Sequence, residues 1–446
     1  MRILLIGANA CKMNDGRRWQ ETHVRAAYAP TTLTTLAALV PPELNAEVTV
    51  IDEAVDRVPD DFGGADLVGI SAMTSDAQRA YQLADQARAL RIPVVLGGYH
   101  PTFMPEEAGK HADAVVKGFA ETAWPQLLRD FARGAMNPLY ESAWEEAFTS
   151  GAWLPRRDLL RRKAYSTANT MEASRGCANR CSFCIVPPMH QNRFVQRQME
   201  RIHADIDSMP AGPIALLDPN PLESSASAAA LLPTLAGRKW FAAASMKSAA
   251  NRSWVKAARA SGCRGLMIGF ESLDANVLAA AGKAFNDVRA YEETCKMLRG
   301  EGIAILGSFV FGFDGEERSV FERTAEFVFR NRLNLVLYSV YTPFPGTNAW
   351  TRLNAHGRIL TRDWSLYDGR HAVFAPTKMT VDNLEQGLYD AWNETYSLRS
   401  IFTRVAGSRT MPLVSLAANL GFRYYRRTFM PAEETGTLRG EPCEFS

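Results

Sequence analysis

The sequence predicts an α/β protein in which an N-terminal doubly wound, Rossmann-like domain precedes a partial (β/α)6 TIM barrel and a mainly helical C-terminal cap. Short apolar strands alternate with helical segments over residues 1–130, and six further β/α repeats follow within 166–350. A loop with three cysteines comes after the first of these repeats. We expect residues 131–165 to be an irregular linker and residues 351–446 to form the cap and a tail.

The composition fits a protein with several cores. The chain has 446 residues, 47% of them hydrophobic, which is enough for two or three domains. Its formal net charge of +2 gives no general sign of nucleic-acid binding. No apolar run reaches the roughly 18 residues of a membrane span, and the N-terminus enters a strand directly. We therefore expect a cytoplasmic protein without a membrane span.

The four cysteines outside the loop are scattered along the chain. They are Cys11, Cys263, Cys295 and Cys443, and their spacing matches no disulfide framework. This pattern favours a reducing compartment.

The N-terminal domain is predicted from five strands that alternate with helical segments. A helix is expected over Leu33–Val40 and another over Asp76–Leu90, where apolar residues recur at helical spacing. The expected parallel strands are Arg2–Gly7, Glu47–Asp52, Asp66–Ser71, Pro93–Gly97 and Asp113–Lys117.

Ligands of such sheets bind at the carboxyl ends of the strands, so the residues that follow each strand are the candidate site. The Gly97-Gly98 pair lets the backbone approach a flat ligand, which a side chain would prevent. The candidates at these strand ends are Ser71, Met73, Gly97, Gly98, Tyr99 and His100.

The barrel is predicted from six strands and the helices between them. Helices are expected over Val195–Asp207, Arg252–Ala260 and Asp287–Gly300. The expected strands are Ala168–Ala173, Ile214–Leu217, Lys239–Ala244, Gly265–Ile268, Ala304–Phe311 and Leu335–Tyr341. The active site of a barrel lies at the carboxyl ends of its strands, and the cysteine loop follows the first of them.

Cys177, Cys181 and Cys184 are spaced C-x3-C-x2-C. Three thiolates on one short loop can hold three irons of a [4Fe-4S] cluster and leave the fourth iron open to a small molecule. The alternatives are coincidence or a structural zinc site. Zinc normally takes four ligands, and His190 stands six residues past Cys184 behind two prolines.

This spacing resembles the motif of the radical S-adenosylmethionine (SAM) enzymes. The resemblance implies that SAM fills the open iron site and is cleaved to a 5'-deoxyadenosyl radical, with electrons from a donor such as flavodoxin or ferredoxin. Phe183, between two cluster ligands, is then expected near the adenine. Arg175 and Arg180 flank the loop and either tune the cluster potential or are solvated.

Other strand-end segments resemble the same family. Gly269-Phe270-Glu271-Ser272 is similar to its G-x-E-S segment, in which the acid touches SAM, and Lys283 stands where relatives carry a base for the SAM carboxylate. Glu271 in a structural ion pair and Lys283 on the surface are the alternatives. The remaining candidates for cofactor contact are Ser272, Ser245, Thr342 and Pro343, together with Asp218-Pro219-Asn220, which is equally an ordinary turn, and Gly312–Glu316.

The N-terminal domain resembles the cobalamin-binding domain of one radical SAM branch. Ser71-Ala72-Met73 is similar to the S-x-L loop of that domain, and Gly97-Gly98 matches its diglycine. The D-x-H-x-x-G motif that ligates cobalt in some relatives is absent, because Gly7–Cys11 stands in its place. If cobalamin binds, no histidine from that loop ligates it. The alternative is a domain that keeps the fold without the cofactor.

The resemblance implies a cobalamin-dependent methyltransferase that acts on an unactivated carbon of a small molecule. A methyl group would pass from SAM to cobalt and then to a substrate radical. A cyclisation or rearrangement, and transfer of the 3-amino-3-carboxypropyl group of SAM, are the alternatives, besides a non-catalytic cobalamin sensor or a zinc-stabilised binding protein.

The C-terminal third offers fewer signals. Trp364, Tyr367 and His371 either cap the barrel against substrate or pack on the core. Between Arg399 and Met430 there are six arginines and no acidic residue, so this segment either contacts an anionic substrate or a membrane surface, or is a solvated face.

Overall fold

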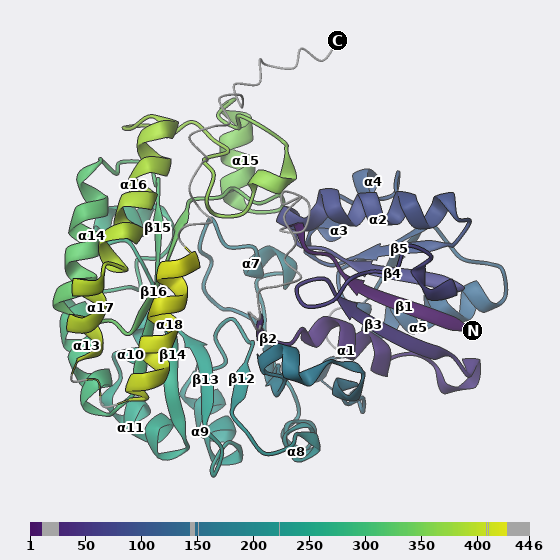
Figure 1. The fold of residues 1–446 in the computed structure, drawn as a ribbon, viewed down its shortest axis with the longest axis horizontal. Coiled ribbons are helices and arrows are strands. Elements are labelled where there is room, and N and C mark those ends of the chain that lie inside the picture. The colour runs from purple at the N-terminus through teal and green to yellow at the C-terminus, as the bar shows by residue number, and fades with distance from the viewer. Residues whose placement is uncertain are drawn as a thin grey trace.

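The computed structural model describes residues 1–10, 26–142, 148–149, 151–222, 224–406, 408 and 410–425. Cys11 and the acidic tail that contains Glu433 and Glu444 lie outside these residues. Two six-stranded sheets, each flanked by helices, make up most of the chain (Figure 1). This is the predicted α/β fold with a helical C-terminal part.

The N-terminal sheet is parallel, with the strand order β3-β1-β4-β5-β6-β7. Its strands are β1 (Arg2–Gly7), β3 (Glu47–Asp52), β4 (Leu67–Ser71), β5 (Val94–Gly97), β6 (Ala114–Lys117) and β7 (Leu139–Glu141). The five expected strands are confirmed. The prediction of an irregular segment over 131–165 was wrong at β7, because three residues are too short for a periodic pattern.

Helices cover both faces of this sheet (Figure 1). On one face, α1 (Thr31–Ala38) and α5 (Ala120–Ala132) bury Leu33, Trp124 and Leu127. On the other face lie α2 (Ala77–Ala89), α3 (Tyr99–Phe103) and α4 (Pro105–Ala108). A two-stranded ribbon of β2 (Ala26–Tyr28) and β8 (Tyr165–Thr167) joins the start of the chain to the start of the barrel.

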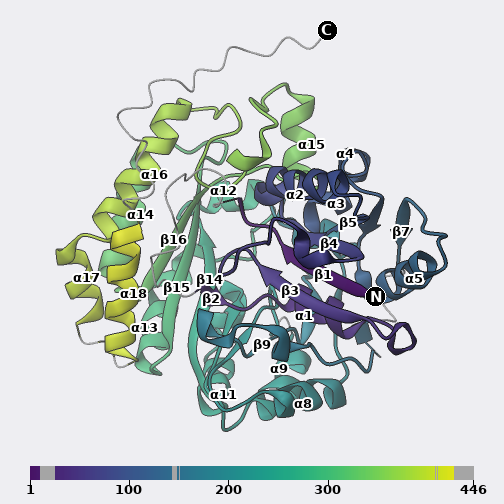
Figure 2. The same ribbon diagram turned by 45° about the vertical axis from the view of Figure 1, so that its right-hand side comes forward.

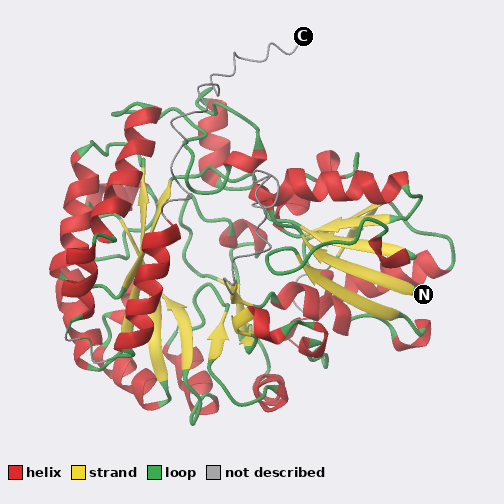
Figure 3. Ribbon diagram, in the orientation of Figure 1, coloured by secondary structure: helices red, strands yellow, loops and turns green. Residues whose placement is uncertain are grey.

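The second sheet is the predicted partial barrel. Its parallel strands follow one another in chain order, from β9 (Thr170–Met171) through β12 (Ile214–Leu216), β13 (Trp240–Ala244), β14 (Cys263–Glu271) and β15 (Ala304–Phe311) to β16 (Leu335–Val340). Helices lie outside the curved sheet (Figures 2 and 3). They are α9 (Ser225–Thr234), α10 (Met246–Ala249), α11 (Arg252–Ala260), α12 (Ala275–Ala280), α13 (Tyr291–Gly300) and α14 (Ser319–Arg330).

The expected helix over Val195–Asp207 begins later than predicted. Phe194–Gln196 forms β11, which pairs with β10 (Ser174–Gly176), and α8 runs only over Met199–Ser208. The antiparallel pairing across the cysteine loop holds the first residues of the expected helix in extended form. The base of the loop is therefore a small hairpin.

The C-terminal part comprises α15 (Asn348–Ala355), α16 (Val381–Thr395), α17 (Leu398–Val405) and α18 (Pro412–Tyr425). Between α15 and α16, the chain crosses to the N-terminal domain. Trp364 and Tyr367 are buried in the same core as α2, and the Trp364 indole donates to Glu107 at 2.7 Å. These two aromatic residues therefore pack between domains, whereas His371 is exposed beside Asp368.

No described helix combines the length and the apolar character needed to cross a bilayer.

The interface between the domains depends on a glycine, and its substitution gives a first prediction. Gly346 has a φ of +87°, and a Cβ there would overlap the Phe103 ring of α3; Gly357 has a φ of +65° but open space around it. Both Gly→Ala changes should cost about 1 kcal/mol in backbone strain. We expect Gly346→Ala to lower the free energy of unfolding by a further 1–3 kcal/mol or so through overpacking, measured by denaturant titration. Equal losses in the two variants would contradict this close contact.

A candidate site between the two sheets

The cysteine loop is seated on the barrel by backbone hydrogen bonds. It runs from β10 to α7 (Val186–Met189). The Ser182 N–H donates to the Ala281 carbonyl, and the Ser182 carbonyl accepts from the Ala349 N–H, both at 2.9 Å. Gly282 has a φ of +73°, and a Cβ there would come within 2.9 Å of the Arg180 carbonyl. The loop therefore rests on the segment after α12 and on the first turn of α15.

The three thiols share one locality. Cys177, Cys181 and Cys184 are each partly buried, and Asn179 donates to the Cys177 sulfur at 3.4 Å. Burial and the charges of the other two thiols raise the pKa of Cys184 to about 12, although Lys283 opposes this rise. Among the described residues, no three His, Cys, Asp or Glu side chains are arranged to hold a single metal ion. A cluster differs in that each thiolate binds its own iron.

Glu271 and Lys283 meet beside this loop. The Lys283 ammonium donates to the Glu271 carboxylate at 2.6 Å, and both residues are less than a tenth exposed. Burial alone would lower the pKa of Lys283, but Glu271 and the Cys181 thiol raise it overall. Glu271 sits at an irregularity of β14 with a φ of +62°, a strained conformation for a residue other than glycine. The two residues predicted to touch SAM are thus brought together as a buried ion pair.

Phe183 faces the ends of the last two barrel strands. Its ring lies 5.5 Å from that of Phe313 and 6.2 Å from that of Tyr341, measured between centroids. Phe313 stands two residues after the end of β15, and Tyr341 directly follows β16. The structure therefore joins the cysteine loop, Gly312–Glu316 and Thr342–Pro343 at one end of the barrel.

Three other predicted contact residues make local hydrogen bonds. The Ser272 hydroxyl donates to Glu316 at 2.9 Å, and the Thr342 hydroxyl donates to the Val340 carbonyl at 2.9 Å. Ser245 caps α10 by accepting from the Ser248 N–H. Pro343 follows Thr342 in the same loop. These side chains organise the strand ends, and none of them pairs with Glu271 or Lys283 in the structure.

Asp218 holds the chain where it enters the cysteine loop. Its buried carboxylate accepts from the Ala173 N–H at 3.1 Å and from both the N–H and the hydroxyl of Ser174, the latter at 2.6 Å. Burial raises the pKa of Asp218 to about 7, although these hydrogen bonds favour the charged form. Asp218 is therefore a buried support of the loop.

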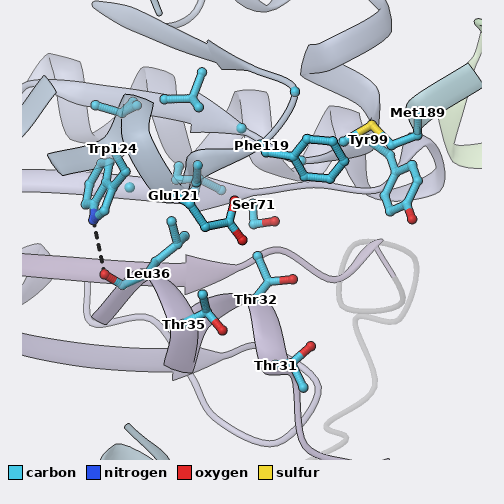
Figure 4. A pocket seen from close by; sticks show the side chains of 18 of the residues that line it. Thr31, Thr32, Thr35, Leu36, Ser71, Tyr99, Phe119, Glu121, Trp124 and Met189 are labelled. Atoms are coloured by element: carbon cyan, nitrogen blue, oxygen red, sulfur yellow. Dashed lines mark hydrogen bonds between the residues drawn. The ribbon is translucent and has the colours of Figure 1, made fainter. Parts of the chain in front are cut away.

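A cavity opens at the carboxyl ends of β4, β5 and β6 (Figure 4). Ser71, Met73, Gly97, Gly98 and Tyr99 line it, as the sequence analysis expected. The barrel side of the same cavity is formed by Glu172, Arg175, Met189 and His190. Burial lowers the pKa of His190 to about 3, with a further contribution from Arg175, so this histidine is neutral. The cavity thus has walls from both domains.

His100, which the sequence analysis also placed at this site, is not among the residues that line the cavity. The imidazole is fully buried, packs against Tyr81 and Trp364, and lies 3.5 Å from the Glu107 carboxylate. Consecutive helical residues point about 100° apart, so Tyr99 and His100 face different sides.

Arg175 bridges the two domains. Its guanidinium, on the strand before Cys177, donates to Glu121 of α5 at 2.5 Å and to Glu172 at 3.0 Å. It also lies over the rings of Phe119 and Phe148. Burial would lower the pKa of Arg175, but Glu172 and Glu121 raise it overall. Arg175 is therefore a paired, buried cation, whereas Arg180 across the loop is exposed.

The sequence analysis missed several residues of the cavity. Trp124 closes its inner end and donates to the Leu36 carbonyl at 3.1 Å (Figure 4). The run of threonines that begins α1 supplies Thr31, Thr32 and Thr35. A run of hydroxyl residues at the start of a helix is the feature of the sequence from which these threonines could have been predicted.

Comparison with known families identifies both parts of the chain. The sequence profile of the B12-binding domain matches residues 40–128, and that of the radical SAM superfamily matches residues 171–328. The chain is 31% identical over 373 residues to the bacteriochlorophyllide d C-12(1)-methyltransferase of Chlorobaculum tepidum, with 81% of each chain covered. It is 24% identical over 361 residues to the hopanoid C-2 methylase of Rhodopseudomonas palustris, covering 76% of this chain and 67% of that one.

Solved structures share the fold. TsrM from Kitasatospora setae with cobalamin and a [4Fe-4S] cluster matches with a TM-score of 0.66 and 15% identity, over 96% of this chain and 99% of that one. OxsB with aqua-cobalamin and SAM matches with a TM-score of 0.68 and 14% identity, over 96% and 71%.

The bridging cation gives a second prediction. Arg175→Gln leaves Glu121 and Glu172 without their buried partner, so we expect the free energy of unfolding to fall by about 3–5 kcal/mol. The exposed Arg180→Gln, on the other side of Cys177, should change it by less than about 0.5 kcal/mol. Denaturant titration of the two variants measures the free energy of unfolding. Similar losses in both would show that the ion pairs of Arg175 do not stabilise the contact between the domains.

Asp218 gives a third prediction. Its pKa near 7 lies above the value of about 3.9 expected in the unfolded chain, so the folded protein binds the extra proton. Stability due to this group is complete below about pH 4 and falls as pH rises to about 7, by up to about 4 kcal/mol. Asp218→Asn should remove this part of the pH slope in unfolding measurements. Asp287→Asn is the control: it changes an exposed carboxyl whose pKa is lowered, and the fall in stability between about pH 4 and pH 7 should remain. An unchanged slope in Asp218→Asn would contradict the assignment.

Proposed function

The chain belongs to the cobalamin-dependent radical SAM methyltransferases, and from this premise we propose that it methylates an unactivated carbon of a small-molecule substrate. Its cofactors are a [4Fe-4S] cluster, SAM and cobalamin. When bound, the cluster supplies the electron that cleaves SAM, and cobalamin supplies the methyl group.

Methyl transfer is supported by the position of Tyr99. This residue follows the glycine pair of the N-terminal domain and lines the cavity there. Burial, together with the charges of Glu172 and Cys184 on the barrel side, raises its pKa to about 12. The cavity that fits cobalamin is therefore a close neighbour of the loop that fits the cluster. A methyl donor and a radical source placed so close together can act on one substrate carbon.

The residues present suit these groups chemically. The three soft thiols are the ligands that cluster iron requires. Glu271 and Lys283 offer a carboxylate to the ammonium of SAM and an ammonium to its carboxylate, and Phe183 offers an aromatic face for adenine. The strained backbone of Glu271 fits a ligand clamp, since such strain gathers at binding sites.

The cavity in the N-terminal domain suits cobalamin in turn. A Cβ on Gly118 would project into open space, so the backbone there can approach a flat ligand. A Cβ on Gly98 would instead come within 2.7 Å of the Ala72 carbonyl, so that glycine is required by the packing of the protein itself. Ser71 and the threonines of α1 offer hydroxyls to polar groups of the cofactor. We place cobalamin there.

The relatives guide the choice of substrate. Their names assign methylation to bacteriochlorophyllide d and to hopanoids, which are large and mainly apolar ring systems. We propose that this chain acts on a molecule of that class, with flavodoxin or ferredoxin as the electron donor.

A fourth prediction tests methyl transfer. Anaerobic turnover of the reconstituted enzyme with SAM labelled by a trideuterated methyl group should yield S-adenosylhomocysteine, 5'-deoxyadenosine and a product that carries the intact label. Bacteriochlorophyllide d and a hopanoid are the first substrates to offer, with mass spectrometry as the readout. Deoxyadenosine without S-adenosylhomocysteine would instead indicate cyclisation or rearrangement, and methylthioadenosine would indicate aminocarboxypropyl transfer.

Three variants give this experiment its controls. Cys181→Ala should abolish 5'-deoxyadenosine formation because it removes a cluster ligand. Cys295→Ala should retain it, since that buried thiol packs in the barrel core. Glu271→Gln should raise the SAM concentration at which formation of both SAM-derived products is half-maximal. An unchanged concentration would contradict a contact between Glu271 and SAM.

A further inference from the structure

The last described helix, α18, presents an apolar face to solvent. Leu413, Leu420 and Tyr424 are 80%, 42% and 59% exposed, and Val414 is 56% exposed. Together with the exposed Ala417, positions 413, 417, 420 and 424 follow helical spacing, so they form one stripe along α18. No acidic or basic residue interrupts it. The neighbouring helix α17 exposes Leu398 and Phe402 as well.

Buried polar contacts fix this orientation of α18. Asn419, on the opposite face, is fully buried and donates to the Asn334 carbonyl at 2.8 Å. The buried Arg404 of α17 donates to Asn419 at 2.9 Å and to the Leu333 carbonyl at 2.8 Å. Phe422 stacks on Tyr396, with 5.4 Å between ring centroids. Rotating the apolar stripe inward would break these hydrogen bonds of Asn419 and Arg404. A buried polar group without a partner costs free energy. Asn419 and Phe422 therefore hold the inward face of α18 on the barrel, and the apolar stripe stays on the outward face.

The segment of sequence that carries the stripe has charge of one sign. From Arg399 to Met430 the sequence holds six arginines and no acidic residue. Of these, Arg399 is exposed on α17, and Arg423 donates to the Tyr396 carbonyl beside the stripe. Arg426 and Arg427 directly follow α18 in the sequence, outside the described residues. An apolar face within a cationic segment is the pattern of a helix that lies in the headgroup region of an anionic membrane.

We propose that α18 docks this enzyme on the surface of a bilayer that contains anionic lipids. Leu413, Leu420 and Tyr424 would enter the boundary between headgroups and acyl chains, and Arg399 and Arg423 would meet the lipid phosphates. At 14 residues, α18 is too short to span a bilayer, so the contact is parallel to the surface. This placement brings the enzyme to the phase in which a large apolar substrate would reside. The docking proposal itself depends only on the surface of α18.

Vesicle binding of the full-length protein, without turnover, tests the proposal. We expect co-sedimentation with vesicles of phosphatidylcholine containing about one third phosphatidylglycerol, and much weaker binding to pure phosphatidylcholine or at high salt. The double variant Leu413→Gln and Leu420→Gln should lose at least about tenfold in partition coefficient. The matched control, Leu139→Gln with Leu360→Gln, alters two leucines that are exposed elsewhere and should bind as the wild type does.

A fluorescent variant, Tyr424→Trp, reports on the stripe itself. Nine native tryptophans contribute background, so the wild-type spectrum is subtracted. A blue shift of the difference spectrum on adding anionic vesicles supports docking. A blue-shifted difference spectrum in buffer alone would show that the chain covers the stripe itself. A dimer that the double Leu→Gln variant disrupts would show that a second copy covers it. Either result, or wild-type indifference to anionic vesicles, overturns the proposal.

Discussion

The buried cation Arg175 is the interaction on which the relation of the two domains depends. It is joined to Glu121 of α5 and to Glu172 of the barrel, and it stands two residues before the first loop cysteine. A guanidinium placed between aromatic rings cannot lose either carboxylate without a large electrostatic cost. The distance from the cysteine loop to the cavity at the strand ends is therefore set by charge pairing, and the adjacency of the two cofactor sites follows from it.

The buried acids at the same end of the barrel are held in two different ways, by hydrogen bonds and by backbone geometry. Asp218 and Glu316 are buried carboxylates that hold chain turns through N–H groups, and burial raises the pKa of each to about 7. Glu271 is instead presented by a strained bend in β14 and meets a lysine. The two supporting carboxylates accept hydrogen bonds from N–H and hydroxyl groups, whereas Glu271 accepts from a lysine ammonium. Buried acids with different kinds of partner thus lie at the strand ends of one barrel.

The strands and the cysteine motif could be predicted because their signals are local. Apolar runs such as Arg2–Gly7 and the C-x3-C-x2-C spacing can be read without knowing the partners of any residue. The short strand β7 carried too little periodicity, and the start of α8 was displaced by pairing with β10, a contact across the loop. The role of Arg175 depends on Glu121, 54 positions away. The position of His100 could not be predicted, because the rotation of α3 decides which of two neighbours faces the cavity.

The place of Trp364 and Tyr367 in the core of the N-terminal domain has a consequence for biosynthesis. With Val373, they complete the apolar packing under α2, although the strands of that domain end more than 200 residues earlier in the chain. We therefore expect one side of the first sheet to stay uncovered during synthesis until residues 364–373 have been translated. The two domains should then complete their folding together, and a fragment cut after α5 would carry an uncovered apolar surface prone to aggregation.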